Sequence, residues 1–160
     1  METSKALSRA AALCSRSEHC ESDIRAKLAQ WQVDSDDADT IVARLRGEGF
    51  INDERYARAY VHDKWLYNGW GRVKLAAMLR QKGISGECIA AAMEQIVDDD
   101  YQQQLMRVLR AKLRDVASRE PRLARAALLR AAAARGFEPQ LCYDAVDQLL
   151  NTTNDDGCHD

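Results

Sequence analysis

The sequence predicts an all-α protein in which three tandem three-helix repeats form an elongated, curved array. Three observations lead to this prediction. Alanine is abundant and runs of β-branched residues are absent, which favours helices over strands. The 160 residues contain only two prolines, Pro121 and Pro139, so helices can run almost without interruption. Finally, one pattern of apolar residues occurs three times along the chain.

The repeated pattern sets the domain boundaries. Residues 23–45 superpose on residues 74–96 with a shift of 51, and a further shift of 53 reaches residues 127–149. Each segment reads as a helix, a turn and a helix, and a longer helix precedes it. One such unit buries little surface by itself, so stacked units would supply a continuous core. We therefore assign residues 1–50, 51–100 and 101–151 to three repeats, and residues 152–160 to a disordered acidic tail.

Local signals place the elements of each repeat. The long first helices are expected at about residues 4–17, 53–67 and 101–118, from their apolar periodicity. The turns between the second and third helices read "QVDSDD", "KGISGE" and "RGFEPQ". The residues expected just beyond the second helices are Gln32, Gly83 and Gly136. The third helices are expected to open at Ser35, Ser85 and Glu138-Pro139.

The joint between the first two repeats, "GEGFINDE", combines a helix end with a helix start. Gly47 is the expected residue beyond the preceding helix. Asn52 suits the N-cap position, and the two acidic residues after it favour the first turn. Ile51 and Tyr56 have the spacing of a hydrophobic staple. Phe50 and Ile51 should therefore pack at the joint between the repeats.

The net charge of −2 conceals strong segregation along the chain. Residues 51–86 carry +4 and residues 101–135 carry +7, whereas residues 87–100 carry −5 and residues 136–160 carry −6. Basic and acidic blocks thus alternate. A basic surface is expected even though the pI is 5.9.

The sequence offers no catalytic motif. It contains no phosphate-binding GxxxxGK[ST], no GxGxxG, no GxSxG and no HExxH. The acidic runs at residues 34–39 and 98–100 lack the ligand spacing of a calcium loop. The five cysteines include no CxxC pair, which argues against structural zinc. We expect a protein that is not an enzyme and that needs no metal or cofactor.

The same reading indicates the compartment. No apolar run approaches the roughly 20 residues of a membrane span. The N-terminus lacks the long apolar region of a signal peptide. An odd number of cysteines without paired spacing fits a reducing environment. A cytoplasmic protein without membrane contact is therefore expected.

Basic residues and aromatic residues gather in the second and third repeats. Lysines and arginines surround a group formed by Trp65, Tyr67 and Trp70. In the third repeat, arginines follow steps of three and four residues, so they share one face of a helix. Such a surface suits nucleic acid or an acidic protein groove. Ordinary solvated helix faces would show the same composition.

Residues 49–85, "GFINDERYARAYVHDKWLYNGWGRVKLAAMLRQKGIS", resemble the signature of the RecX family. That signature has a Gly-aromatic-Ile-acidic start, an Arg-aromatic-Ala helix, a Gly-aromatic-Gly turn, a basic helix and a Lys-Gly-Ile end. The corresponding stretches here are Gly49-Phe50-Ile51-Asn52-Asp53, Arg55-Tyr56-Ala57, Gly69-Trp70-Gly71, residues 72–80 and Lys82-Gly83-Ile84.

This resemblance implies a non-enzymatic regulator of the recombinase RecA in recombination and DNA repair. Members of the family bind in the helical groove of the RecA–single-stranded DNA filament. They limit filament growth, ATP hydrolysis by RecA and strand exchange. For this chain it implies the RecA filament as partner, a weak contact with single-stranded DNA, no membrane contact and a monomeric state.

We expect the basic and aromatic residues to face the filament, with Trp70 as an anchor. The expected filament-facing residues are Lys64, Tyr67, Trp70, Arg72, Lys74, Arg80, Lys82, Arg107, Arg110 and Arg114. Val73, Leu75, Met78 and Leu79 should instead point into the core. The expected joint residues are Phe50, Ile51, Asn52 and Tyr56.

Two other functions fit a three-helix repeat. A helix-turn-helix-like reader of DNA would bind a specific duplex sequence tightly without RecA. A general α-solenoid adaptor would bind proteins without dependence on nucleic acid or salt.

Overall fold

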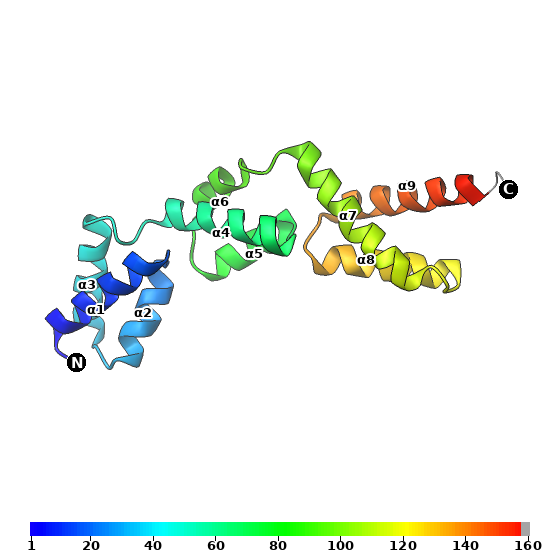
Figure 1. Ribbon diagram of the computed structural model, residues 1–160. Helices are drawn as coiled ribbons and strands as arrows, with labels where there is room; N and C mark the ends of the chain where they lie inside the picture. Colours follow the sequence, from blue (N-terminus) through cyan, green and yellow to red (C-terminus); the bar gives the residue numbers. More distant parts are fainter. Residues whose placement is uncertain (158–160) are drawn as a thin grey trace. The chain divides into compact units, whose positions relative to one another are not determined.

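A computed structural model describes residues 1–157 of the chain, and within that range it contains nine α-helices and no strand (Figure 1). This confirms the all-α prediction. The chain divides into two compact units. One unit comprises Met1–His62 with Ala77–Gln95, and the other comprises Asp63–Ala76 with the chain from Ile96 onward. The fourth and fifth helices contribute residues to both units.

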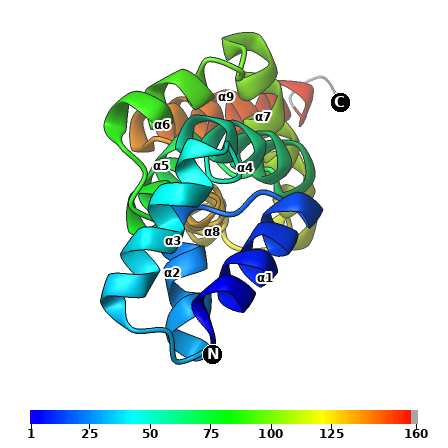
Figure 2. The ribbon, with the colours of Figure 1, turned by 90° about the vertical axis from the view of Figure 1, so that its left-hand side faces the viewer.

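The first repeat is a group of three helices (Figure 2). Its core forms because buried apolar residues recur four positions apart on each helix, as in Ala6 and Ala10, or Ile24 and Leu28. Ile51, which precedes the next helix, is buried in the same core. The helices are α1 (Thr3–Arg16), α2 (Glu21–Gln30) and α3 (Ser35–Gly47).

The ends of these helices agree with some of the predicted capping residues and differ from others. Gln32 takes a positive φ of 61° after α2, as predicted. Asp34 is the N-cap of α3, since its side chain accepts from the Asp37 N–H at 2.9 Å, and Ser35 is the first helical residue. The prediction for Gly47 is wrong: it belongs to α3, and Gly49 has the left-handed φ of 81°.

Hydrogen bonds explain why Gly49, and not Gly47, is the left-handed residue after α3. The Phe50 N–H donates to the Leu45 carbonyl at 2.8 Å, and the Gly49 N–H donates to the Arg46 carbonyl at 3.1 Å. These two bonds form a Schellman motif, which satisfies the last carbonyls of the helix. The motif needs a left-handed residue directly after the cap, and Gly49 supplies it without strain.

The second repeat contains α4 (Asp53–Asn68), α5 (Arg72–Gln81) and α6 (Gly86–Met93). The Asn52 side chain accepts from the Arg55 N–H at 3.0 Å, so Asn52 caps α4. On α5, Leu75 and Leu79 are fully buried, whereas Val73 is 49% exposed, so its predicted core position is wrong. Val73 lies two residues before Leu75, which places it on the opposite side of the helix. Met78 is half-buried.

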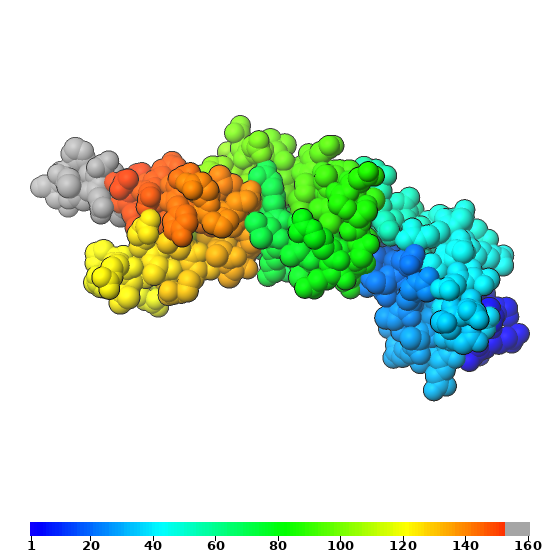
Figure 3. All heavy atoms as spheres, turned by 180° about the vertical axis from the view of Figure 1, so that it is seen from behind, coloured from blue at the N-terminus to red at the C-terminus, as the bar shows by residue number. Residues whose placement is uncertain are grey.

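The third repeat contains α7 (Asp98–Val116), α8 (Pro121–Ala134) and α9 (Pro139–Gly157). Figure 3 shows α8 and α9 side by side on one face. Helix α7 begins at Asp98, three residues before the predicted start, because carboxylates stabilise the first turn of a helix. Gly136 has a φ of 90° between α8 and α9, and Gly83 has a φ of 80° between α5 and α6, both as predicted.

Helix α9 continues to Gly157. It therefore includes the first six residues of the segment 152–160 that the sequence assigned to a disordered tail, and residues 158–160 of that segment lie outside the described residues. In the part of the chain that the structure describes, no helix is both long and apolar enough to cross a membrane. The curvature of the array stays a prediction.

Candidate partner-binding surface

The glycine–tryptophan–glycine turn between α4 and α5 packs directly on the turn between α8 and α9. The Gly71 N–H donates to the Arg135 carbonyl at 2.7 Å, and the Val73 N–H donates to the Gly136 carbonyl at 2.9 Å. A Cβ on Gly136 would lie 2.6 Å from the backbone nitrogen of Lys74, and a Cβ on Gly71 would overlap the Gly136 carbonyl. These two glycines are therefore required for close approach of the two backbones.

Two positive charges lie close to the ring of Trp70 in this turn. The ammonium nitrogens of Lys64 and Lys74 are 5.0 Å and 4.3 Å from the centre of a Trp70 ring. Cation–π attraction acts at these distances. The backbone N–H of Trp70 donates to the Lys64 carbonyl at 3.1 Å, and the Trp70 side chain is half-buried. Nearby in sequence, Tyr67 is 80% exposed. We call Lys64, Trp70 and Lys74 the Trp70 patch.

Arg72, in contrast, is held by internal partners. Its guanidinium contacts the Asp98 carboxylate at 2.7 Å and the Glu138 carboxylate at 3.2 Å. It also lies 3.9 Å from the centre of the Tyr101 ring. Burial alone would lower the pKa of Arg72, but the hydrogen bonds to the two carboxylates outweigh it and raise the pKa. This side chain joins α5 to the third repeat.

Tyr101 is the centre of that contact, and the sequence pattern did not predict it. Its hydroxyl donates to the Glu138 carboxylate and accepts from the Arg72 N–H at 2.9 Å. Its ring stacks on Trp65 at 5.4 Å and touches Phe137 at 5.1 Å. Burial, followed by the bond to Glu138, raises the pKa of the phenol. The signal in the sequence that could have indicated this contact is the presence of glycines in both turns, at Gly71 and Gly136. A close contact between the two backbones brings the polar residues beside them together.

The predicted stripe on α7 faces solvent. Arg107, Arg110 and Arg114 are all exposed, while Leu105 and Leu109 on the other side of the helix are fully buried. Arg107 donates to the Gln104 side chain. Among the described residues, Arg110 and Arg114 have no carboxylate within ion-pair distance. We call these three arginines the α7 stripe.

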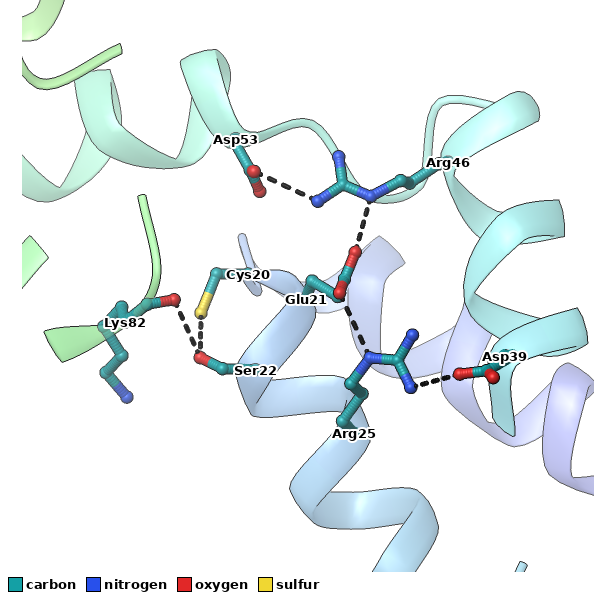
Figure 4. Close-up of polar contacts among 8 residues, drawn as sticks. All are labelled: Cys20, Glu21, Ser22, Arg25, Asp39, Arg46, Asp53 and Lys82. Atoms are coloured by element: carbon teal, nitrogen blue, oxygen red, sulfur yellow. Dashed lines mark hydrogen bonds and ion pairs between the residues drawn. The ribbon is translucent and has the colours of Figure 1, made fainter. Parts of the chain in front are cut away.

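The two basic residues at the end of α5 differ from each other. Arg80 is exposed and forms no ion pair with any described residue. Lys82 contacts Asp23 at 2.7 Å, and that hydrogen bond raises the pKa of Lys82. The carbonyl of Lys82 also accepts from the Ser22 hydroxyl at 3.0 Å (Figure 4). Lys82 therefore connects the second repeat to α2.

A chain of ion pairs joins α2 and α3 to the start of α4 (Figure 4). Glu21 lies between Arg46 at 2.7 Å and Arg25 at 3.1 Å. Arg46 extends the chain to Asp53 at 3.0 Å, and Arg25 extends it to Asp39 at 2.8 Å. The hydrogen bond from Arg46 is the main reason that the pKa of Glu21 is lowered.

At the joint itself, the apolar residues pack inward. Ile51 is 2% exposed, and Phe50 is half-buried against the core of the first repeat. Tyr56 is buried one turn into α4, while the capping residue Asn52 is exposed. This joint fixes the start of α4 and presents little surface to a partner.

Among the described residues, no cluster of histidine, cysteine, aspartate or glutamate is arranged to hold a metal ion. Cys14, Cys20, Cys88 and Cys142 are free thiols. Burial raises the pKa of Cys14 and of Cys142, which makes these thiols less reactive at neutral pH.

The fold and the surface together define an all-α protein of three-helix repeats, in which polar turns join the repeats and exposed arginines line α7. Comparison with known proteins identifies its family. The family model described as "RecX, first three-helix domain" matches residues 6–45, and "RecX, second three-helix domain" matches residues 52–93. The chain belongs to the RecX family.

Relatives extend this similarity over most of the chain. "Regulatory protein RecX" of Mycolicibacterium vanbaalenii is 30% identical and aligns with 93% of this chain and 86% of its own length. The protein of the same name from Amycolatopsis mediterranei is 25% identical, over 80% of this chain and 73% of its own. A solved structure of regulatory protein RecX has a TM-score of 0.83 at 25% identity and covers 91% of this chain and 71% of its own.

A second solved structure, RecX from Lactobacillus salivarius, shares the fold with a TM-score of 0.80. It is 19% identical and covers 94% of this chain and 97% of its own.

Proposed function

We propose that this protein regulates RecA by binding the RecA–single-stranded DNA filament, and that it mainly inhibits RecA's ATPase, filament growth and strand exchange. The observation that carries this proposal is family membership, since a relative named as a regulatory protein aligns with 93% of the chain. The signature in residues 49–85, read from the sequence alone, implied RecA as the partner.

The contacting side chains in this proposal are basic and aromatic groups that are exposed or that lie at the Gly69–Trp70–Gly71 turn. They are the α7 stripe, the Trp70 patch, Tyr67 and Arg80. Arg110 and Arg114 support this choice because they keep their charge exposed and unpaired among the described residues. Arg72 and Lys82 act indirectly, since their ion pairs hold the neighbouring turns in place.

The protein acts in this proposal without catalysis of its own and without a cofactor. It works in the cytoplasm as a monomer. Regulation then depends on occupancy of the filament, so inhibition should follow a binding curve and should weaken as salt screens the exposed arginines.

A capture experiment tests the proposal. The protein is immobilised and exposed to RecA with oligo-dT and a slowly hydrolysed ATP analogue, and in parallel to RecA alone. Capture should increase strongly when the filament can form. Equal capture without DNA would indicate a general protein adaptor and would contradict the proposal. So would tight binding to one duplex sequence in the absence of RecA, which would indicate a DNA reader.

A further inference from the structure

The first repeat contains a basic groove that none of the surfaces described above includes. Arg9, Leu13 and Arg16 follow steps of four and three residues, so they share one face of α1. Lys27 in the last turn of α2 and Trp31, the residue directly after α2, are four positions apart and lie on one side of that helix end. Together with neighbouring small and polar side chains they line a groove of about 370 Å³. This volume lies within the range of roughly 300–1,000 Å³ that is usual for ligand sites.

The basic residues of this groove differ from the other arginines of the first repeat because they form no ion pair within the described part of the chain. Three further arginines of the first repeat, Arg25, Arg44 and Arg46, each contact a carboxylate. Arg9, Arg16 and Lys27 contact none among the described residues. No carboxylate lines the groove within the described chain, although residues 1–50 contain nine acidic residues against seven basic ones. A region of net negative charge thus keeps three free cations at one concave site.

The groove also has an aromatic wall. The Arg9 guanidinium lies 4.4 Å from the centre of a Trp31 ring, and Trp31 is half-buried against the core of the repeat. A fixed indole with a guanidinium on it offers a stacking surface of the kind that binds unpaired bases. The cations at Arg16 and Lys27 are placed on the two helices at either side, where they can contact phosphates.

We propose that this groove binds a single strand of nucleic acid, with Arg16 and Lys27 on phosphates and the Trp31–Arg9 pair beside a base. The combination of free cations with an aromatic wall favours a nucleic-acid strand over an acidic peptide, which would need the cations alone. This site shares no residue with the Trp70 patch or the α7 stripe. It gives the protein a contact with DNA that does not depend on RecA.

The test measures binding of fluorescent oligo-dT to the full chain by anisotropy, over a range of salt concentrations and without RecA. The variant Arg16→Gln with Lys27→Gln removes two cations that neutralise phosphates in the proposal. The log–log salt slope should become shallower by about 1.4, since each neutralised phosphate of a single strand adds roughly 0.7 to the slope. The matched control Arg44→Gln with Arg58→Gln removes the same charge from solvent-exposed ion pairs and should keep the original slope.

Three outcomes would overturn the inference: an unchanged slope in the groove variant, an equal change in the control, or polyglutamate competing with oligo-dT as well as unlabelled oligo-dT does. Circular dichroism establishes that both variants fold. Because no RecA is present, a failure here leaves the proposed regulation of RecA untouched. A failure of filament capture would equally leave this site untouched.

Discussion

At the scale of single residues, the glycines of the turns have two distinct roles. Gly83 and Gly136 occupy equivalent positions and share a left-handed backbone, with φ values of 80° and 90°. A Cβ on Gly83 would meet nothing within 4 Å, whereas a Cβ on Gly136 would collide with Lys74. The conformation of Gly83 is therefore its only constraint, while Gly136 must also leave room for a neighbouring backbone.

This difference gives a prediction with a built-in control. Gly83→Ala should cost about 1–2 kcal/mol, because only the left-handed conformation is penalised. Gly136→Ala should cost about 1–3 kcal/mol more, because it adds a collision in a packed region. Urea denaturation of both variants measures the two free energies. Equal losses would show that the backbones do not approach closely at Gly136.

A second prediction at this scale concerns acid. Burial would raise the pKa of Asp23, but the hydrogen bonds from Lys82 and Cys20 outweigh it and hold the pKa below its usual value. The pKa of an aspartate in the unfolded chain is about 3.9. At pH values around and below this, the unfolded chain therefore binds more protons at Asp23 than the folded chain does. The stabilisation of the folded state by ionised Asp23 is complete above the unfolded pKa. It is lost as the pH falls through the lower pKa that Asp23 has in the folded state.

The variant Asp23→Asn should therefore reduce the dependence of unfolding free energy on pH between about pH 5 and pH 2. The surface change Asp115→Asn serves as the control, since Asp115 is exposed. Denaturant melts at several pH values provide the measurement. The ion pair with Lys82 would be unimportant if both variants kept the slope of the parent protein.

At the scale of elements, the two contacts between successive repeats follow one plan. In each contact, the start of the second helix of one repeat meets a turn of the following repeat. That turn joins the second and third helices of the following repeat. Asp23 of α2 meets Lys82 in one contact, and Arg72 of α5 meets Glu138 in the other. The signs of the charges are exchanged between the two. Exchanged charges disfavour pairing of the wrong surfaces, since like charges would then face each other.

Tyr101 allows the second contact to be tested. The variant Tyr101→Phe removes a hydroxyl that donates to Glu138 and accepts from the Arg72 N–H. It should cost about 1–3 kcal/mol, because the partly buried backbone N–H of Arg72 loses its acceptor and the Glu138 carboxylate loses one of its donors. The control Tyr143→Phe changes a side chain that is 47% exposed, and it should stay within about 0.5 kcal/mol. Similar urea midpoints for the two variants would contradict the role given to Tyr101.

The helical class and several helix ends could be predicted because their causes are local. Asn52 and Ser85 lie within three residues of the N–H groups that they cap. The end of α3 was misplaced because two glycines, Gly47 and Gly49, compete for one role, and only the hydrogen bonds from Gly49 and Phe50 decide between them.

It was harder to predict which basic residues of the candidate surface are free, because their ion-pair partners are distant in sequence. Arg72 looked like a free cation, but its partners Asp98 and Glu138 lie 26 and 66 residues away. Lys82 likewise pairs with Asp23 across 59 residues. Helical spacing shows which face a side chain occupies, but it does not show which other element covers that face.

At the scale of the whole molecule, the net charge of −2 is a poor guide to the surface. Many cations are neutralised by carboxylates inside the repeats, as the chain from Asp39 to Asp53 shows. The cations that remain exposed and unpaired include Arg110 and Arg114 of the α7 stripe. In the proposed function this stripe contacts the RecA filament, while the paired arginines only stabilise the fold.

Titration of RecA's DNA-dependent ATPase with the protein tests this claim most directly. The stripe variant replaces Arg107, Arg110 and Arg114 with glutamine. The control replaces Arg44, Arg58 and Arg125, which pair with surface carboxylates. Removing three exposed charges that contribute about 0.5–1 kcal/mol each should raise the concentration for half-inhibition roughly 10- to 100-fold. The control should inhibit like the parent protein. Full inhibition by a folded stripe variant would contradict the claim.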